Sequence, residues 1–510
     1  MNKVIITGND LTLEEFVNVC RYGYKVELSL VANKHIYDSN KIMTTILSKN
    51  ECIYGVNTGF GILSDVSIST EDCMQLQKNL IMSHAVGVGE KFSTDVVRGI
   101  ILLRINNLAK GYSGVRNIVV DTLVMMLNKG VHPTVPEKGS LGASGDLVPM
   151  SHVVLPLLGL GYAEYNGVVL DGKEAMQQAQ IPLLQLKEKE GLACINGTQA
   201  MTAVGALTLF DSINIMKIAD ISASLTFEAL NGIMNALDNR IHMLRPYKGQ
   251  IDTARIMSAL LLESEMTTNQ GDLRNQDAYS LRCIPQVHGA SKDLINYVKD
   301  KVKIEMNSVT DNPIIIPESN EVISVGNFHG QPMALCFDFL CIALSELASI
   351  SERRIERLVN PALNEGLPCS LVKNSGINSG YMIIQYAAAA LVSENKVLSH
   401  PACVDSIPSS CNQEDHVSMG TISARKAREI MLNTRKVLAM ELLCACQGID
   451  LRGRKKLGKG TAAAYTLIRE KVPMLESDRE VYLEINECEQ LIIREVLTSK
   501  VESIIGELNF

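Results

Sequence analysis

The amino-acid sequence predicts an all-α fold, with a bundle of long central helices, a mostly helical N-terminal part and one short hairpin. Three observations lead to this prediction. The first proline, a residue that interrupts helices, is Pro133. Apolar residues recur at spacings of three and four over residues 331–359. Strand signals are few, and strands do not alternate with helices as they would in a parallel α/β fold.

The expected elements follow in chain order. Residues 1–132 are expected to be largely helical, with joints at glycines, because no proline interrupts them. Residues 95–110 carry apolar side chains at helical spacing, and Gly111 is a suitable stop. Residues 163–172 hold an Asn-Gly pair between two short apolar stretches, which predicts a β-hairpin.

Three long helices are expected in the second half of the chain. Residues 331–359 are predicted to be helical by apolar side chains at positions 336, 340, 343, 347 and 350. Residues 381–398 are rich in alanine and leucine, which favour helix formation. Residues 425–450 continue the pattern. These segments predict the central bundle.

The chain is expected to form one unit over residues 1–510, because no repeat and no low-complexity linker divides it. Its approximate parts are an N-terminal part, 1–195, and a central bundle with C-terminal helices, 196–510. Apolar residues are 46% and charged residues 20%, the balance of a globular protein. The net charge of −8 and the lack of tryptophan argue against a nucleic-acid partner.

Cysteine and histidine patterns argue against disulfides and metal sites. The 13 cysteines are an odd number and contain no Cys-x-x-Cys pair, so we expect reduced thiols in a cytoplasmic protein. No His-Glu-x-x-His pattern is present, and no metal is expected. The N-terminus has no signal-peptide pattern.

Two uncharged runs, 191–210 and 374–393, are each 20 residues long, the length of a membrane span. Both contain several asparagine, glutamine, serine or threonine residues. We therefore expect two helices buried inside the protein and no membrane partner.

The most unusual local sequence is Gly-Ser-Leu-Gly-Ala-Ser-Gly-Asp-Leu at residues 139–147. A phosphate-binding loop would need a following Gly-Lys-Ser/Thr, which is absent. A hydrolase elbow would need glycine at the position of Asp146. A plain glycine-rich turn remains an alternative.

Backbone chemistry offers a more specific interpretation of this loop. In a tight turn the Gly145 nitrogen, which has no side chain beside it, can attack the Ala143 carbonyl and close a five-membered ring. Loss of that oxygen as water, and of the Ser144 hydroxyl as a second water, leaves a conjugated methylidene group. The product is an electrophile, 4-methylidene-imidazol-5-one, made from Ala143-Ser144-Gly145 without a metal or an external coenzyme.

This loop resembles the signature of the ammonia-lyases that use a methylidene-imidazolone group and act on histidine, phenylalanine or tyrosine. Further segments resemble that family in the same order along nearly the whole chain: YGVNTGFG at 54–61, NGTQA at 196–200, QDAYSLRC at 276–283, GNFHG at 326–330 and NQEDHVSM at 412–419. Six motifs in order are far more specific than any one of them.

Within this family the chain most resembles the enzymes that act on histidine, because of Ser83-His84 and Glu414. The resemblance implies elimination of ammonia from L-histidine to give trans-urocanate, the first step of histidine degradation. His84 and Glu414 can each bind one imidazole nitrogen, and Glu414 is also counted among the catalytic residues. A phenyl ring would leave both partners unsatisfied, at a cost of roughly 1–3 kcal/mol for each buried group.

The resemblance also implies roles for the other site residues. Tyr54 is the candidate base, although a phenol with a pKa near ~10 needs nearby positive charge or hydrogen bonds for this role. Arg282 is expected to bind the substrate carboxylate in a bidentate manner. Asn196, Gln276 and Tyr279 are expected to line the pocket or polarise the electrophile, Tyr279 counting among the catalytic residues.

Phe328 is expected to pack against the ring system. In this family three subunits of a homotetramer build each active site, and the resemblance implies the same assembly here. Whether the substrate amine or its ring adds to the electrophile stays open. Departures at 368–370, where many relatives have Pro-Pro-Phe, and at Val325, where they have glycine, affect only the shape of the pocket.

Three other interpretations compete with this one. An ammonia-lyase or aminomutase acting on tyrosine or phenylalanine is disfavoured by residues 83–84 and Glu414. An inert helical scaffold would need neither the Ala-Ser-Gly triplet nor Tyr54. The fumarase-like lyases are also helical tetramers, but their serine-loop signature is absent.

Overall fold

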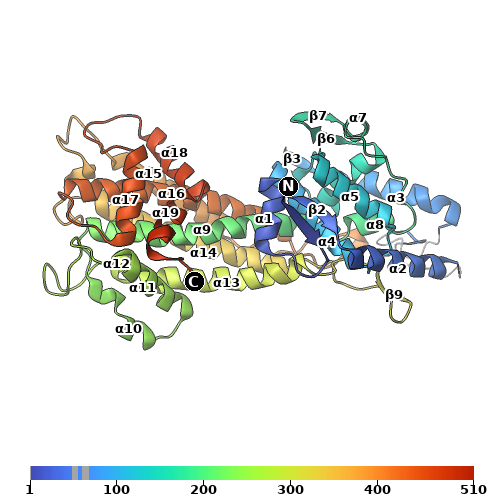
Figure 1. Cartoon of the computed structure of the whole chain (residues 1–510), viewed down its shortest axis with the longest axis horizontal. Coiled ribbons are helices and arrows are strands. Elements are labelled where there is room, and N and C mark those ends of the chain that lie inside the picture. The colour runs from blue at the N-terminus through green and yellow to red at the C-terminus, as the bar shows by residue number, and fades with distance from the viewer. Residues whose placement is uncertain (1, 49–55, 60–67) are drawn as a thin grey trace. The chain divides into compact units, whose positions relative to one another are not determined.

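The structure is a computed structural model that describes residues 2–48, 56–59 and 68–510. Helices dominate it and the strands are short, which confirms the predicted fold class (Figure 1). The chain forms two compact units: unit 1 comprises 1–207, 299–338 and 401–425, and unit 2 comprises 208–298, 339–400 and 426–510.

Unit 1 contains eight helices of its own among the described residues: α1 (Leu13–Tyr22), α2 (Leu30–Leu47), α3 (Thr70–His84), α4 (Thr94–Ala109), α5 (Asn117–Lys129), α6 (Leu147–Val154), α7 (Gly172–Gln178) and α8 (Glu190–Ile195). Its strands are β1 (Lys3–Ile6), β2 (Lys25–Leu28), β3 (Val88–Lys91), β4 (His132–Pro133), β5 (Pro136–Lys138), β6 (Tyr162–Tyr165), β7 (Val168–Asp171), β8 (Ile314–Ile316) and β9 (Glu321–Ile323). A 3₁₀ turn, η2 (Leu155–Leu158), follows α6.

Unit 2 contains α10 (Asn239–Met243), α11 (Lys248–Leu260), α12 (Tyr279–Arg282), α15 (Met382–Leu398), α17 (Lys459–Lys471), α18 (Val481–Ile493) and α19 (Val496–Ile505). Four of the five unit boundaries fall inside long helices: α9 (Gln199–Ala229), α13 (Ile284–Met306), α14 (Gln331–Val359) and α16 (Gly420–Leu451). Short 3₁₀ turns are η3 (Met234–Leu237), η4 (Cys369–Leu371) and η5 (Ser410–Asn412).

The predicted helices are present. The segment predicted at 95–110 is α4, which ends before Gly111 with its φ of 77°. All of its residues from Val96 to Ala109 are buried, so α4 is the core helix of unit 1. The segment predicted at 331–359 coincides with α14. Residues 382–398 form α15, and residues 420–451 form α16.

The predicted hairpin is also present, as β6 and β7. The two strands pair antiparallel, and Asn166 and Gly167 have φ values of 50° and 79°, as a type I′ turn requires. Helix α7 lies beside this hairpin (Figure 1). The remaining sheets were not predicted: β1 with β2, which are parallel, β3 with β5, β4 with β6, and the hairpin β8–β9.

The expectation of two buried helices at the uncharged runs was wrong in part. The first run breaks between α8 and α9, because Gly197 has a φ of 135° that a helix does not allow. In the second run, residues 374–381 are not helical, and left-handed residues such as Gly376 explain why. Helix α15 is largely exposed, with Ile383 at 56% and Tyr386 at 60%.

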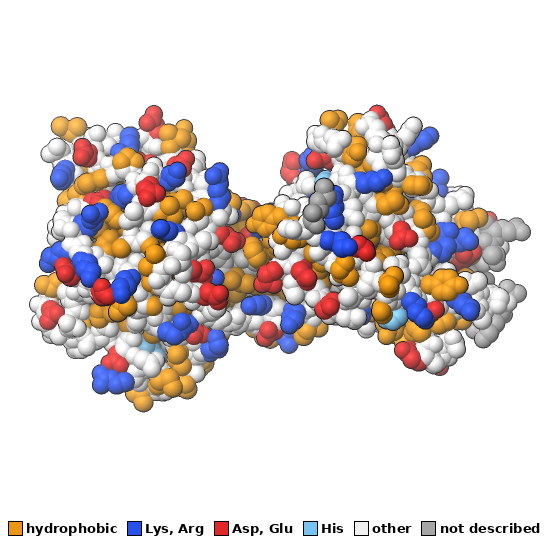
Figure 2. All heavy atoms as spheres, viewed as in Figure 1, with side chains coloured by type: hydrophobic (Ala, Val, Ile, Leu, Met, Phe, Trp, Pro, Cys, Tyr) orange, Lys and Arg blue, Asp and Glu red, His pale blue; other side chains and the backbone are white. Residues whose placement is uncertain are grey.

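Among the described residues, α9 and α14 are long and apolar enough to cross a membrane, by length and composition alone. Most of each apolar window is buried within the protein, 72% in α9 and 67% in α14. Core helices of globular proteins meet the same description. On the face seen in Figure 2, positive and negative side chains are interspersed, as expected of a surface in contact with water.

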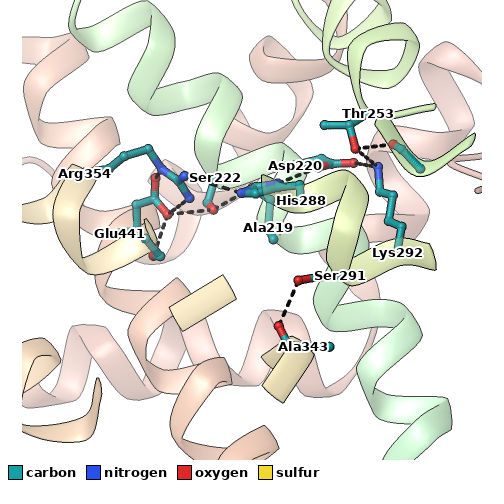
Figure 3. A network of polar contacts seen from close by, with 12 residues as sticks. Ala219, Asp220, Ser222, Thr253, His288, Ser291, Lys292, Ala343, Arg354 and Glu441 are labelled. Atoms are coloured by element: carbon teal, nitrogen blue, oxygen red, sulfur yellow. Dashed lines mark hydrogen bonds and ion pairs between the residues drawn. The ribbon is translucent and has the colours of Figure 1, made fainter. Parts of the chain in front are cut away.

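The interior of unit 2 contains a buried polar network (Figure 3). Glu441 accepts hydrogen bonds from Arg354 Nε at 2.5 Å and Nη2 at 2.9 Å. Its other donors are hydroxyl groups: Ser222 at 3.0 Å, Thr226 at 2.8 Å and Ser351 at 2.6 Å. Burial alone would raise the pKa of Glu441, but Arg354 and these hydroxyls hold it below its usual range. The network therefore keeps Glu441 ionised inside the unit.

Candidate active site

The glycine-rich loop lies between β5 and α6, and the structure makes it a tight turn. Gly142 and Gly145 both have a φ of 74°, a left-handed conformation that favours glycine. Gly145 pairs with Gly197, and a Cβ added to Gly145 would lie only 2.2 Å from the Gly197 carbonyl oxygen. Ala143 and Ser144 are partly exposed. The packing around the loop therefore requires glycine at position 145, the residue whose nitrogen would close the ring.

Asp146 anchors this loop, a role that the sequence interpretation missed. It is fully buried and accepts hydrogen bonds from Ser140 Oγ at 2.9 Å, from Met201 N at 2.8 Å and from the Thr421 hydroxyl. Its own N–H donates to Gly197 O at 2.7 Å. Burial raises the pKa of Asp146, although these hydrogen bonds oppose the shift. In the sequence, the only feature that could have indicated this role is an acidic residue among small and apolar neighbours.

The segment 412–419 packs against the same loop. Ser418 Oγ donates to Gly142 O at 3.3 Å, and Met419 N donates to Leu141 O at 3.2 Å. A Cβ on Gly142 would lie 2.4 Å from Ser418 Oγ. The structure thus brings together two motifs that are more than 250 residues apart in sequence.

His84 and Glu414 both lie in unit 1. His84 is the last residue of α3, and its Nδ1 atom is 3.0 Å from Ser83 Oγ. Burial lowers the pKa of His84, while the Leu80 carbonyl and the negative charge of Glu414 act in the opposite direction. Glu414 itself accepts a hydrogen bond from Ser409 Oγ at 2.9 Å. The two predicted ring-binding residues therefore interact electrostatically.

Asn196 lies at the break between α8 and α9 and is 1% exposed. Its Nδ2 donates to Asn312 O at 3.3 Å, whereas its Oδ1 is buried and has no hydrogen-bond partner among the described residues. The buried Arg104 donates to Asn196 O at 2.5 Å and to Ala193 O at 3.0 Å. The backbone carbonyl of Asn196 is thus hydrogen-bonded, and its side-chain Oδ1 is still able to accept a hydrogen bond.

Phe328 is partly buried in the turn before α14. Its neighbour His329 stacks on His416, with ring centroids 5.7 Å apart and an interplanar angle of 9°. This contact joins the GNFHG segment to the segment that holds Glu414. Tyr54, the candidate base, lies outside the described residues.

Three predicted residues form a second group, in unit 2. Arg282 Nη1 donates to Gln276 Oε1 at 2.8 Å, and the guanidinium lies 4.7 Å from the centre of the Tyr279 ring. Tyr279 is 71% exposed. Arg282 Nε is buried and has no partner among the described residues. Among the described residues, the predicted site residues thus fall into two groups, one in each unit.

No group of three or more His, Cys, Asp or Glu side chains that could hold a metal is found in the part of the chain that the structure describes. The residues present do fit an electrophile formed from residues 143–145. The turn holds Gly145 in a left-handed conformation against Gly197, and Asn196 offers a buried acceptor in the same segment as Gly197.

Comparisons with known proteins agree with the motifs. A family model described as aromatic amino acid lyase matches residues 11–470. A histidine ammonia-lyase of Clostridium tetani is 58% identical over 509 residues, 99% of each chain. The crystal structure of histidine ammonia-lyase from Trypanosoma cruzi matches with a TM-score of 0.92 at 40% identity, covering 98% of this chain and 95% of that chain. Tyrosine aminomutase from Streptomyces globisporus matches with a TM-score of 0.96 at 37% identity, covering 99% and 100%.

These matches confirm the family resemblance that the six motifs predicted. The family model spans most of the sequence, and both the curated relative and the solved structures align with almost all of it. The chain belongs to the aromatic amino acid lyase family.

Proposed function

We propose that this chain eliminates ammonia from L-histidine to give trans-urocanate, the first step of histidine degradation. The observation that carries the proposal is the placement of His84 and Glu414 together in unit 1, which also holds the Ala-Ser-Gly turn. The 58% identity to a histidine ammonia-lyase supports the same substrate. The self-formed methylidene-imidazolone of residues 143–145 supplies the electrophile that makes nitrogen a good leaving group.

The substrate ring is recognised by two hydrogen-bonding side chains. The Ser83 hydroxyl donates its single proton to Leu80 O at 3.1 Å, so its oxygen accepts from His84 Nδ1. His84 Nε2 is then the atom that meets one nitrogen of an imidazole, and Glu414 meets the other. Each partner left unsatisfied by a phenyl ring would cost roughly 1–3 kcal/mol, which favours histidine over phenylalanine.

The remaining residues hold the amino-acid part of the substrate. The planar guanidinium of Arg282 suits a bidentate carboxylate, and its hydrogen bond to Gln276 fixes its orientation. The oxygen Oδ1 of Asn196 accepts from a substrate or loop N–H, and Phe328 packs against the ring. Tyr54 removes the β-proton, with Tyr279 as the second phenol of the site.

The proposed assembly is a homotetramer whose active sites draw on three subunits. The exposure of Tyr279 and of the apolar residues Ile383 and Tyr386 on α15 supports an assembly that covers them. The proposed location is the cytoplasm. The described cysteines are all free, which supports a reducing compartment. Sedimentation of an active monomer would contradict the tetramer.

The direct test is ammonia release and urocanate formation with L-histidine, without added metal or coenzyme. Ser144→Ala has no hydroxyl to eliminate and cannot form the methylidene group, so it should fold normally, lack the mass loss of two waters and lose nearly all turnover. Full activity in this variant would contradict the electrophile assignment.

The specificity test compares Glu414→Gln with Asp415→Asn, a matched change at the exposed neighbouring carboxylate. We expect the first variant to lose histidine turnover without a matching loss of melting temperature, and the second to resemble the wild type. Equal losses of melting temperature and turnover in Glu414→Gln would indicate a structural role instead.

A further inference from the structure

His152 lies on α6, outside the predicted site, and contacts the segment that follows His84. Its Nε2 atom accepts the N–H of Gly87 at 3.0 Å. A backbone N–H can only donate, so Nε2 carries the lone pair and the ring proton is on Nδ1. Burial lowers the pKa of His152, which favours this neutral form.

The close approach of the ring depends on glycine at position 87. A Cβ added there would lie 3.1 Å from His152 Nε2 and 3.1 Å from Pro136 Cβ. A side chain there would therefore require the imidazole or Pro136 to shift by a few tenths of an ångström. The absence of a side chain at Gly87 thus leaves room for the His152 ring to accept the Gly87 N–H.

The chain between His84 and Gly87 is a tight turn. Val86 N donates to His84 O at 3.0 Å, and Ala85, at the end of α3, has φ −82° and ψ 66°. These values describe an inverse γ-turn, which leaves little slack between the two residues. Fixing the backbone at Gly87 therefore fixes the end of α3 and the base of the His84 side chain.

The other side of Gly87 leads to the electrophile loop. Strand β3 begins at Val88 and pairs with Lys138 of β5, and β5 runs directly into the loop. A Cβ on Gly139 would lie 3.5 Å from Gly87 Cα, so the two chain segments touch. Helix α6, which carries His152, follows the loop immediately. These contacts form a closed loop that contains Ser144, and His84 is joined to it at Gly87 through the turn described above.

We infer that His152 is a positioning residue for substrate recognition, whose hydrogen bond to Gly87 sets the place of His84 relative to the electrophile loop. The inference rests on the proposed function, because it gives His84 the task of binding the substrate ring. His152 acts through Gly87 and does not itself touch the substrate.

Two variants test this inference, His152→Gln and His152→Asn. Both replace the imidazole with an amide, and the two side chains differ in length. The amide of glutamine reaches about as far as Nε2 and can accept the Gly87 N–H, whereas the amide of asparagine reaches only about as far as Nδ1. We expect His152→Asn to raise KM for L-histidine about tenfold, the equivalent of one lost hydrogen bond, while kcat changes less. We expect His152→Gln to stay within about threefold of the wild type, and both variants to keep the mass loss of two waters.

Hydrogen exchange of residues 82–90, measured without substrate, supplies a second readout. Exchange should be faster in His152→Asn and unchanged in His152→Gln. Equal KM values in all three proteins, equal losses in both variants, or unchanged exchange in His152→Asn would overturn this inference alone. A wild-type chain that releases no ammonia from L-histidine would instead contradict the proposed function, and this inference would fall with it.

Discussion

Replacing Gly197 with alanine should damage both the stability of unit 1 and the formation of the electrophile. Gly197 has a φ of 135°, and its carbonyl accepts the Asp146 N–H at 2.7 Å. A Cβ at this position would lie 2.6 Å from Thr310 O, 2.7 Å from Thr310 Oγ1 and 2.6 Å from Gln199 Oε1. The backbone would have to move away from Thr310 and would take its carbonyl with it.

The expected cost has two parts. A side chain at this φ is strained by about 1–3 kcal/mol. Forcing a methyl group into packed surroundings costs about 1–3 kcal/mol more. The sum, roughly 2–6 kcal/mol, corresponds to a fall in melting temperature on the order of 10 °C for a unit of this size. Because Gly145 is held by Gly197, we also expect incomplete ring closure.

Two assays and one control test this prediction. Intact mass reports the fraction of chains that have lost two waters, and calorimetry reports the melting temperature. Gly167→Ala is the control, because Gly167 also has a positive φ, 79°, but nothing lies within 4 Å of the added Cβ. It should lose only about 1 kcal/mol and mature fully. Complete maturation of Gly197→Ala, with a melting temperature equal to that of the control, would show that glycine is not required at position 197.

Two further predictions concern buried charges. Glu441→Gln should destabilise unit 2 by about 3–5 kcal/mol, because it leaves Arg354 buried without its countercharge. The control is Glu429→Gln on the exposed face of α16, which should keep the melting temperature of the wild type. Equal melting temperatures in the two variants would contradict the stabilising role of Glu441. Burial and the charge of Arg98 lower the pKa of His132 to about 4 from 6.5, so between these values the unfolded chain binds a proton that the folded chain does not. Stability should therefore fall as the pH drops from about 6.5 to 4, and His132→Gln, followed by melting temperature against pH, should show a shallower fall. An identical slope would exclude His132 as its cause.

The long helices could be predicted from the sequence because their apolar spacing is local information. Residues 331–359 and 95–110 show this spacing, and both are helices. The hairpin at Asn166-Gly167 was predictable for the same reason. The parallel pair β1–β2 was not, because strands of four residues carry little pattern and their pairing depends on the helix between them.

The exposure of α15 could not be predicted from the sequence either. Its alanine-rich composition predicts a helix and does not show whether the same chain covers it. The helix exists, but only Ile384, Ala388 and Asn395 are buried.

The chemistry of the site could be read from motifs, but the contacts that build it could not. Asp146 was visible only as a residue that excludes a hydrolase elbow. Its role depends on Met201 and Thr421, which are far away in sequence. The contact between Gly197 and Gly145 could not be predicted either, because the uncharged run around Gly197 was expected to be one continuous helix.

The most direct test of the proposed chemistry is ultraviolet absorbance over time with L-histidine, L-tyrosine and L-phenylalanine supplied separately, without metal or coenzyme. We expect a rising band of a conjugated acrylate with histidine alone. A rise with tyrosine or phenylalanine instead would contradict the roles of His84 and Glu414 while leaving the electrophile in place. No rise with any of the three would contradict the formation of a working electrophile by residues 143–145.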